Sequence, residues 1–240
     1  MKAVLLRIGI DTGCGGIHGP LFKDGSFEYV PIPDMTDGEG IDERRYGNTV
    51  GRFGCELVQY FPKPKQDRMK DCPIHFDPEF QSFTYGDPTP PKAGLRNLES
   101  GDFLIFYCGL QGFDYKSEPH LYLMGYFEVE VAGRVEEFCE DELFKLFGKN
   151  FHVKHPQVFE CQRERLVLVK GSENSRMLKK AVKISAYSQD KSGKRLKILS
   201  PEMQKVFGNF GGKVSIQRCP PRWIETSHIE RTVEYIESLE

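Results

Sequence analysis

Apolar residues in this chain gather in short runs of the length expected for strands. Residues 2–10 form a continuous apolar run that ends at a glycine-rich segment, residues 13–16, which predicts a buried strand followed by a tight turn. Residues 103–110 and 120–131 are strongly apolar and aromatic, with a polar loop between them. We expect these two segments to pair as the central hairpin of an antiparallel sheet.

The second half of the chain alternates between short strand and helix signals. Further strands are predicted at residues 165–170 and 181–187, and a short amphipathic helix over 139–148. Another helix should begin at Ser200-Pro201, because serine caps helix starts and proline suits the first turn.

The C-terminal segment predicts an amphipathic helix. Ser227 and Glu230 have the spacing of a capping box, and four apolar residues follow at helical spacing. These residues are Ile229, Val233, Ile236 and Leu239. By contrast, residues 31–48 and 62–94 are rich in proline and predict loops.

Together these elements predict an α+β fold. Its core would be a mainly antiparallel sheet or a small, partly open barrel, with short flanking helices and a C-terminal amphipathic helix. We favour a single domain over residues 1–240, which suits the length of the chain. The alternative divides the chain into an acidic, pocket-bearing part at 1–150 and a basic part at 151–240.

Cysteine spacing and hydropathy bear on the compartment. The chain has 7 cysteines, scattered without any C-x-x-C pair, which is typical of reduced thiols in the cytoplasm. The mean hydropathy is −0.47, and no apolar run approaches the roughly 18 residues of a membrane span. We therefore expect a cytoplasmic protein with no membrane partner.

Charge is unevenly distributed along the chain although its net value is only −2. Residues 1–150 contain 16 basic and 25 acidic residues, whereas residues 151–222 contain 16 and 5. Such asymmetry favours a basic face for phosphates, and the alternative is an ordinary solvated surface. The residues that we assign to nucleic-acid contact are Lys194, Arg195, Lys197, Arg218, Arg222 and Trp223.

The loop after the first strand combines polar side chains with glycines. Arg7, Asp11 and His18 surround Gly15 and Gly16, whose missing side chains allow a ligand to approach the backbone. The segment matches neither the phosphate-binding loop nor the dinucleotide fingerprint. Its alternative interpretation is a tight structural turn with a surface histidine.

His75 and Asp77 form a second polar pair. They lie two residues apart, so they share one face if the segment is extended, and they suit metal binding, water polarisation or contact with a substrate hydroxyl. A metal would need a third ligand, for which Asp11, His18 or His120 are candidates. We assign no metal ligands, and the sequence names no cofactor.

A third histidine pair, His152 and His155, has the H-x-x-H spacing. On a helix this spacing would serve a metal, but Val153 and Pro156 favour extended backbone. We therefore interpret the pair as structural.

The ordered motifs resemble one known family. They are R-x-G-x-D-x-G-x-G-G at residues 7–16, P-I-P-D at 31–34, H-F-D-P-E at 75–79, G-D-F-L-I-F at 101–106 and H-L-Y-L-M-G-Y at 120–126. Together they are similar to the third type of nucleotide-modification-associated domain, found in bacteria, archaea and phages, over most of residues 1–160. The resemblance implies an association with DNA or nucleotide base modification. It also implies a shared pocket at Arg7, Asp11, Gly15, Gly16, His75, Asp77, Gly101, Asp102 and His120.

Residues 101–131 carry a second likeness, at the level of the fold alone. Their rhythm is similar to the small barrels of pseudouridine synthases and archaeosine transglycosylases.

These observations lead to one functional hypothesis with two forms. A polar pocket binds a nucleotide or an extruded base, and a basic face contacts phosphates of DNA. As an enzyme, the protein would use Asp11, His75, Asp77 and His120 as candidate catalytic residues. The candidate substrate-binding residues are Arg7, Gly15, Gly16, His18 and Asp102. The alternative is a non-catalytic reader of modified bases or a structural partner of other DNA-modification proteins, and the sequence leaves enzyme and reader open.

Overall fold

A computed structural model describes residues 1–36, 40–217 and 220–240. Its centre is an eight-stranded sheet with the order β12-β1-β6-β7-β8-β5, to which β2 adds beside β6 and β9 beside β7. The strands are β1 (Ala3–Arg7), β2 (Gly19–Leu21), β5 (Thr84–Asp87), β6 (Phe103–Gly112), β7 (His120–Arg134), β8 (Val167–Gly171), β9 (Arg176–Lys183) and β12 (Arg222–Trp223).

The predicted α+β class and the predicted central hairpin are confirmed. β6 and β7 pair antiparallel from Phe103↔Glu128 to Leu110↔His120, and β6 is buried along residues 103–110. β1 lies parallel to β6 on its other side. Because β12 pairs with β1, strands from both ends of the chain meet in one sheet.

The sheet curls but does not close into a barrel. β7 carries two register shifts, between Leu123 and Gly125 and between Val129 and Val131, and such bulges bend a strand. The Tyr85 ring of β5 reaches to 6.1 Å from that of Phe106 in β6, between ring centroids. In a flat sheet their backbones, three strands apart, would be separated by about 14 Å.

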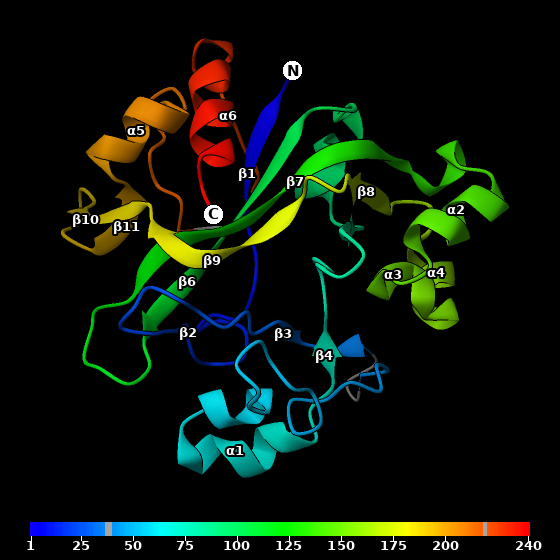
Figure 1. Ribbon diagram of the computed structural model, residues 1–240, viewed down its shortest axis with the longest axis horizontal. Helices are drawn as coiled ribbons and strands as arrows, with labels where there is room; N and C mark the ends of the chain where they lie inside the picture. Colours follow the sequence, from blue (N-terminus) through cyan, green and yellow to red (C-terminus); the bar gives the residue numbers. More distant parts are fainter. Residues whose placement is uncertain (37–39, 218–219) are drawn as a thin grey trace.

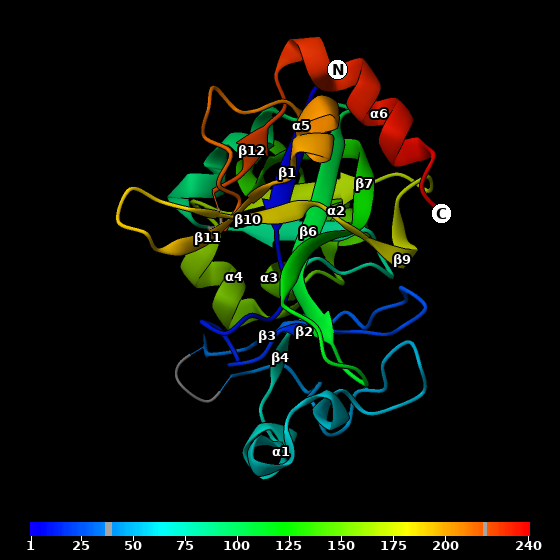
Figure 2. The same ribbon diagram turned by 90° about the vertical axis from the view of Figure 1, so that its left-hand side faces the viewer.

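Two smaller ribbons and a set of short helices surround the sheet (Figures 1 and 2). β10 (Ser185–Gln189) pairs with β11 (Arg195–Leu199), and β3 (Ile32–Pro33) pairs with β4 (Ile74–His75). The α-helices are α1 (Lys63–Lys70), α2 (Glu140–Phe147), α3 (Phe151–Lys154), α4 (Pro156–Gln162), α5 (Pro201–Phe207) and α6 (Ile229–Glu237). The 3-10 helices are η2 (Leu57–Tyr60), η3 (Pro90–Asn97), η4 (Val135–Glu137) and η5 (Thr226–His228).

The helices form groups around the sheet. Figure 1 shows α2, α3 and α4 together at one end of the sheet, and α5, α6 and the β10–β11 hairpin at the other. α1 lies below the sheet with the segment that contains β3 and β4. The C-terminal stripe packs on the main core through buried Ile236 and its three apolar neighbours, as predicted.

Several local predictions are wrong for identifiable reasons. Residues 62–94 are not one loop, because Pro62 and Pro64 stand at the start of α1, where proline is tolerated. The strand expected at 181–187 is broken at Ile184, which is buried and separates β9 from β10. The Ser227 capping box does not form, since the Ser227 hydroxyl contacts the His228 ring instead.

Two further observations concern the described residues only. None of their helices is long and apolar enough to cross a membrane. Among them, Cys55, Cys72, Cys108, Cys139 and Cys161 are free thiols.

The core predicts a large effect for one substitution. The fully buried Phe106 ring packs against Phe80 and Phe127, with centroids 5.6 and 4.7 Å away. Phe106→Ala should therefore lower the free energy of unfolding by about 3–5 kcal/mol, measured by urea denaturation. The matched control is Phe144→Ala, because the Phe144 side chain is 49% exposed. Equal losses in the two variants would contradict the central position of β6.

Candidate functional site

A cavity of about 350 Å³ lies where the end of β1, β4, β5 and α3 meet. Its polar lining residues come from segments far apart in the sequence. They are Arg7, Asp11, His75, Asp77, Asp87, Thr89, Lys92 and His152. The structure thus brings four of the predicted site residues together and adds His152, which the sequence analysis set aside.

Asp77 lies at the floor of the cavity with its side chain only 5% exposed. Its carboxylate accepts hydrogen bonds from the backbone N–H of Gly86 at 3.1 Å and from the side-chain amide of Asn150 at 3.2 Å. A buried carboxylate needs such donors, because burial without them is strongly unfavourable. These bonds therefore fix Asp77 between β5 and α3.

His152 approaches Asp77 because its segment is helical. The prediction of extended backbone for the H-x-x-H segment is wrong: Asn150 caps α3 by accepting from the His152 backbone N–H, and Pro156 begins α4 as a separate helix. His152 Nε2 lies 3.3 Å from Asp77 Oδ2 and 3.2 Å from His75 Nε2. The His75 ring stacks on Phe151 with centroids 3.9 Å apart, which orients it toward His152.

Burial shifts the ionisation of this cluster. It raises the pKa of Asp77 to about 6, although the hydrogen bond from His152 opposes the shift. Burial and the neighbouring His152 ring lower the pKa of His75 to about 3. Burial alone would also lower the pKa of His152, but Asp77 and Gln162 raise it above its ordinary value.

The predicted N-terminal loop forms one wall of the cavity. Arg7 Nη2 lies 2.9 Å from Asp11 Oδ2, while Asp11 Oδ1 accepts from the backbone N–H groups of Gly13 and Cys14. Gly15 has a φ of 96°, and a Cβ there would lie 2.4 Å from Ile10. Gly16 accepts a hydrogen bond from Lys65 at its carbonyl. Neither glycine lines the cavity, so the loop geometry, rather than contact with a ligand, accounts for both.

His18 and Lys197 lie beside this wall. Burial, Lys197 and Arg7 lower the pKa of His18 to about 4, so its ring is neutral at pH 7. The buried His18 Nδ1 has no hydrogen-bond partner within the described part of the chain. Lys197 is half-buried, and the same ranges contain no ion-pair partner for it.

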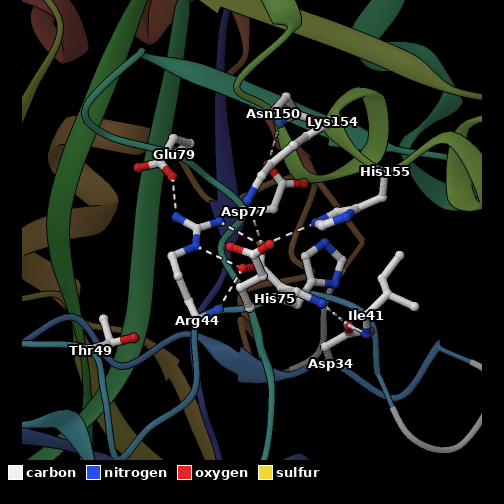
Figure 3. Close-up of polar contacts among 12 residues, drawn as sticks. Asp34, Ile41, Arg44, Thr49, His75, Asp77, Glu79, Asn150, Lys154 and His155 are labelled. Atoms are coloured by element: carbon white, nitrogen blue, oxygen red, sulfur yellow. Dashed lines mark hydrogen bonds and ion pairs between the residues drawn. The ribbon is translucent and has the colours of Figure 1, made fainter.

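A second charged cluster includes Asp42, Arg44, Glu79 and His155, of which Figure 3 labels the last three. The Asp42 side chain is fully buried and accepts from Arg44 at 3.0 and 3.1 Å and from His155 at 3.2 Å. Arg44 also forms an ion pair with Glu79, in which Arg44 Nη1 lies 2.7 Å from Glu79 Oε2. Burial opposes ionisation of Asp42, but its bonds to Arg44 and His155 hold its pKa far below the ordinary value.

Two further predicted residues, Asp102 and His120, also lie outside the cavity. Asp102 is buried at the start of β6, where it accepts from the backbone N–H groups of Lys2 and Glu99. His120 contacts Ser185 and the Tyr187 ring and lines another cavity at the β10–β11 hairpin. The family resemblance placed both residues in one pocket. Asp102 directly precedes β6 and His120 begins β7, and because these strands are antiparallel their starts lie at opposite ends of the hairpin.

The predicted nucleic-acid residues separate into two groups. Lys194, Arg195 and Lys197 lie on the β10–β11 hairpin, where Arg195 stacks on Tyr187 at 3.4 Å and pairs with Glu118. Arg222 and Trp223 form β12 at the edge of the main sheet, and Trp223 is 38% exposed. Arg218 lies outside the described residues.

The sequence analysis missed further residues of the site. Asn150, Asp87 and Lys92 were not singled out, and Lys92 pairs with Asp87 at 2.6 Å on the cavity wall. The only signal for His152 was its H-x-x-H spacing. No local pattern marks Asn150, because its role depends on Asp77, 73 positions away.

Comparison with known proteins gives two results of different weight. A solved structure of the human THYN1 protein in complex with 5-methylcytosine-containing DNA aligns over 100% of this chain and 99% of that chain, with 14% identity. Its TM-score is 0.32, too low to support an argument about fold or function. No curated protein matches the chain.

The family comparison is decisive by coverage. The model described as nucleotide modification associated domain 3 matches residues 2–235, which is nearly the whole chain and extends well beyond the motifs of residues 1–160. The chain therefore belongs to the nucleotide modification associated domain 3 family.

Proposed function

We propose that this protein takes a nucleotide or an extruded DNA base into the cavity and acts on it there. The observation that carries the proposal is the convergence of two imidazoles and a carboxylate, His75, His152 and Asp77, on one cavity. A volume of about 350 Å³ is within the range of small-ligand sites. Membership of a family associated with nucleotide modification supports a nucleotide or a base as the ligand.

Two residues beside the Arg7 wall, His18 and Lys197, form what we call the rim, although neither lines the cavity itself. Lys197, a half-buried cation without an ion-pair partner among the described residues, is available to an anion. His18 is neutral, so its ring adds no charge beside Lys197. The charge of Arg7 lowers the pKa of both His18 and Lys197, so both side chains lie near Arg7. A phosphate bound at this rim would therefore also contact the wall of the cavity.

The β10–β11 hairpin extends this positive rim. Lys194 and Arg195 follow the turn of the hairpin, and Lys197 is two residues further on, at the rim itself. A nucleic-acid backbone that crosses the hairpin would therefore place a phosphate near the cavity. This arrangement supports DNA as the partner that delivers the base.

Removing hairpin charges should weaken nucleic-acid binding in a salt-dependent way. The double variant Lys194→Gln/Lys197→Gln should lower the slope of log affinity against log salt by about 2, roughly one unit for each lost phosphate contact. The measurement is fluorescence anisotropy with a labelled single strand and a duplex that carries one mismatched pair. The control variant Lys145→Gln/Lys149→Gln removes two positive charges from α2 and the turn that follows it. An equal effect of the two double variants would contradict the hairpin as the DNA contact.

Asp77→Asn should separate action on the base from binding. The amide keeps the shape of the side chain but removes its charge, so oligonucleotide affinity should persist while chemistry stops. The measurement is mass spectrometry of DNA nucleosides from cells that express the wild type, the variant or neither. A nucleoside present only with the wild type supports an enzyme. Identical nucleosides in all three cultures would show that the protein is a non-catalytic reader.

His18 predicts a pH-dependent loss of stability. Its folded-state pKa of about 4 lies below the ordinary value of 6.5, so the unfolded chain binds the proton more readily. Stability from this group is present above pH 6.5 and falls as the pH drops toward 4. His18→Gln should remove about 2 kcal/mol of that decline, measured by urea denaturation at several pH values. His228→Gln, outside the cavity, serves as the control, and an unchanged profile for His18→Gln would disprove the assignment.

A further inference from the structure

The three groups at the floor of the cavity point their ligand atoms at one small volume. One possible ligand atom from each of His75, Asp77 and His152 lies within 4.8 Å of the others. The closest pairs are the two Nε2 atoms at 3.2 Å and His152 Nε2 with Asp77 Oδ2 at 3.3 Å. All three side chains line the cavity, so the shared volume opens into it.

Hydrogen bonding alone does not satisfy this arrangement. His152 Nδ1 lies 2.6 Å from Gln162 Oε1, which can only accept, so Nδ1 carries a hydrogen. In the neutral ring the Nε2 atom then has a lone pair, and it faces both the lone pairs of a carboxylate and another imidazole nitrogen. A protonated ring has one N–H at this position, which cannot point fully at both partners.

Two of the three separations match those of neighbouring ligands around one metal ion. With metal–ligand bonds of about 2.1 Å, neighbouring ligands lie about 3.0 Å apart in an octahedral site and about 3.4 Å apart in a tetrahedral one. The observed 3.2 and 3.3 Å fall between these values. One cation would therefore accept all the lone pairs that the hydrogen bonds leave unsatisfied.

We propose that His75, Asp77 and His152 bind one divalent transition-metal ion whose remaining coordination positions face the cavity. Two imidazoles and one carboxylate suit iron(II) or zinc, and three protein ligands with open positions are typical of reactive rather than structural metals. When bound, the ion would act as a Lewis acid beside a molecule that occupies the cavity.

The surroundings of the ligands support this assignment. Gln162 holds the Nδ1 hydrogen of His152, and Asn150 and Gly86 hold the Asp77 carboxylate. Partners of this kind fix the orientation of metal ligands. The neighbouring Asp42 carboxylate is already held by Arg44 and His155, so it does not compete for the ion.

This inference goes beyond the proposed function, and the two can fail separately. Metal binding is measured on the protein alone, without nucleic acid, whereas the oligonucleotide assays above need no added metal. A protein that binds DNA but no metal would overturn only the metal site.

The test is titration of the full chain, after dialysis against a chelator, with cobalt(II) chloride. We expect one equivalent to bind, with visible d–d absorption bands and a rise in melting temperature. His152→Ala and Asp77→Asn should weaken binding at least about 100-fold, and Gln162→Ala, which leaves all three ligands in place, by about 10-fold. Elemental analysis of protein purified without chelator then distinguishes iron from zinc.

His120→Ala is the matched control, because its ring lies outside the cavity. Its cobalt affinity should equal that of the wild type, and circular dichroism reports whether each variant is folded. Failure of the wild type to bind one equivalent, or wild-type affinity in folded His152→Ala and Gln162→Ala, would overturn the proposal.

Discussion

The bend of β7 is the constraint on which the rest of the structure depends. This strand pairs with β6, β8 and β9 at once, and its two register shifts turn the sheet so that β5 comes back toward β6. A flatter sheet would hold Asp87 and Gly86 far from Arg7, because β5 and β1 are separated by three strands in the sheet order. The curl therefore creates the cavity, and the polar residues only have to line it.

Sequence patterns predicted the strands and helices themselves better than the positions at which they begin or break. The apolar runs of β1, β6 and β7 and the helices α2, α5 and α6 depend on local periodicity, which the sequence displays directly. The break at Ile184 depends instead on a backbone bond to Leu121, in a strand distant in sequence. Similarly, proline marks both loops and helix starts, so α1 could not be distinguished from a loop by composition.

The candidate site could be predicted in part, because some of its residues are linked by local spacing. His75 and Asp77 lie two residues apart, and their shared face followed from that spacing alone. Arg7 and Asp11 are linked within one loop. His152 was lost because Pro156 was interpreted as evidence for extended structure, whereas it starts a new helix after a single break at His155. The contact of His152 with His75 is a tertiary one, which no local sequence rule predicts.

Asn150 links the start of α3 to the position of Asp77, and this link bears on how the site forms during folding. Its carboxamide is used at both ends, the oxygen for the first turn of α3 and the nitrogen for Asp77. The helix start and the position of the carboxylate are therefore two results of one side-chain orientation. Closing the long chain segment between them is entropically unfavourable until the sheet has curled. The floor of the cavity should thus be among the last regions to become ordered during folding, so a ligand that binds there selects molecules that have completed the fold.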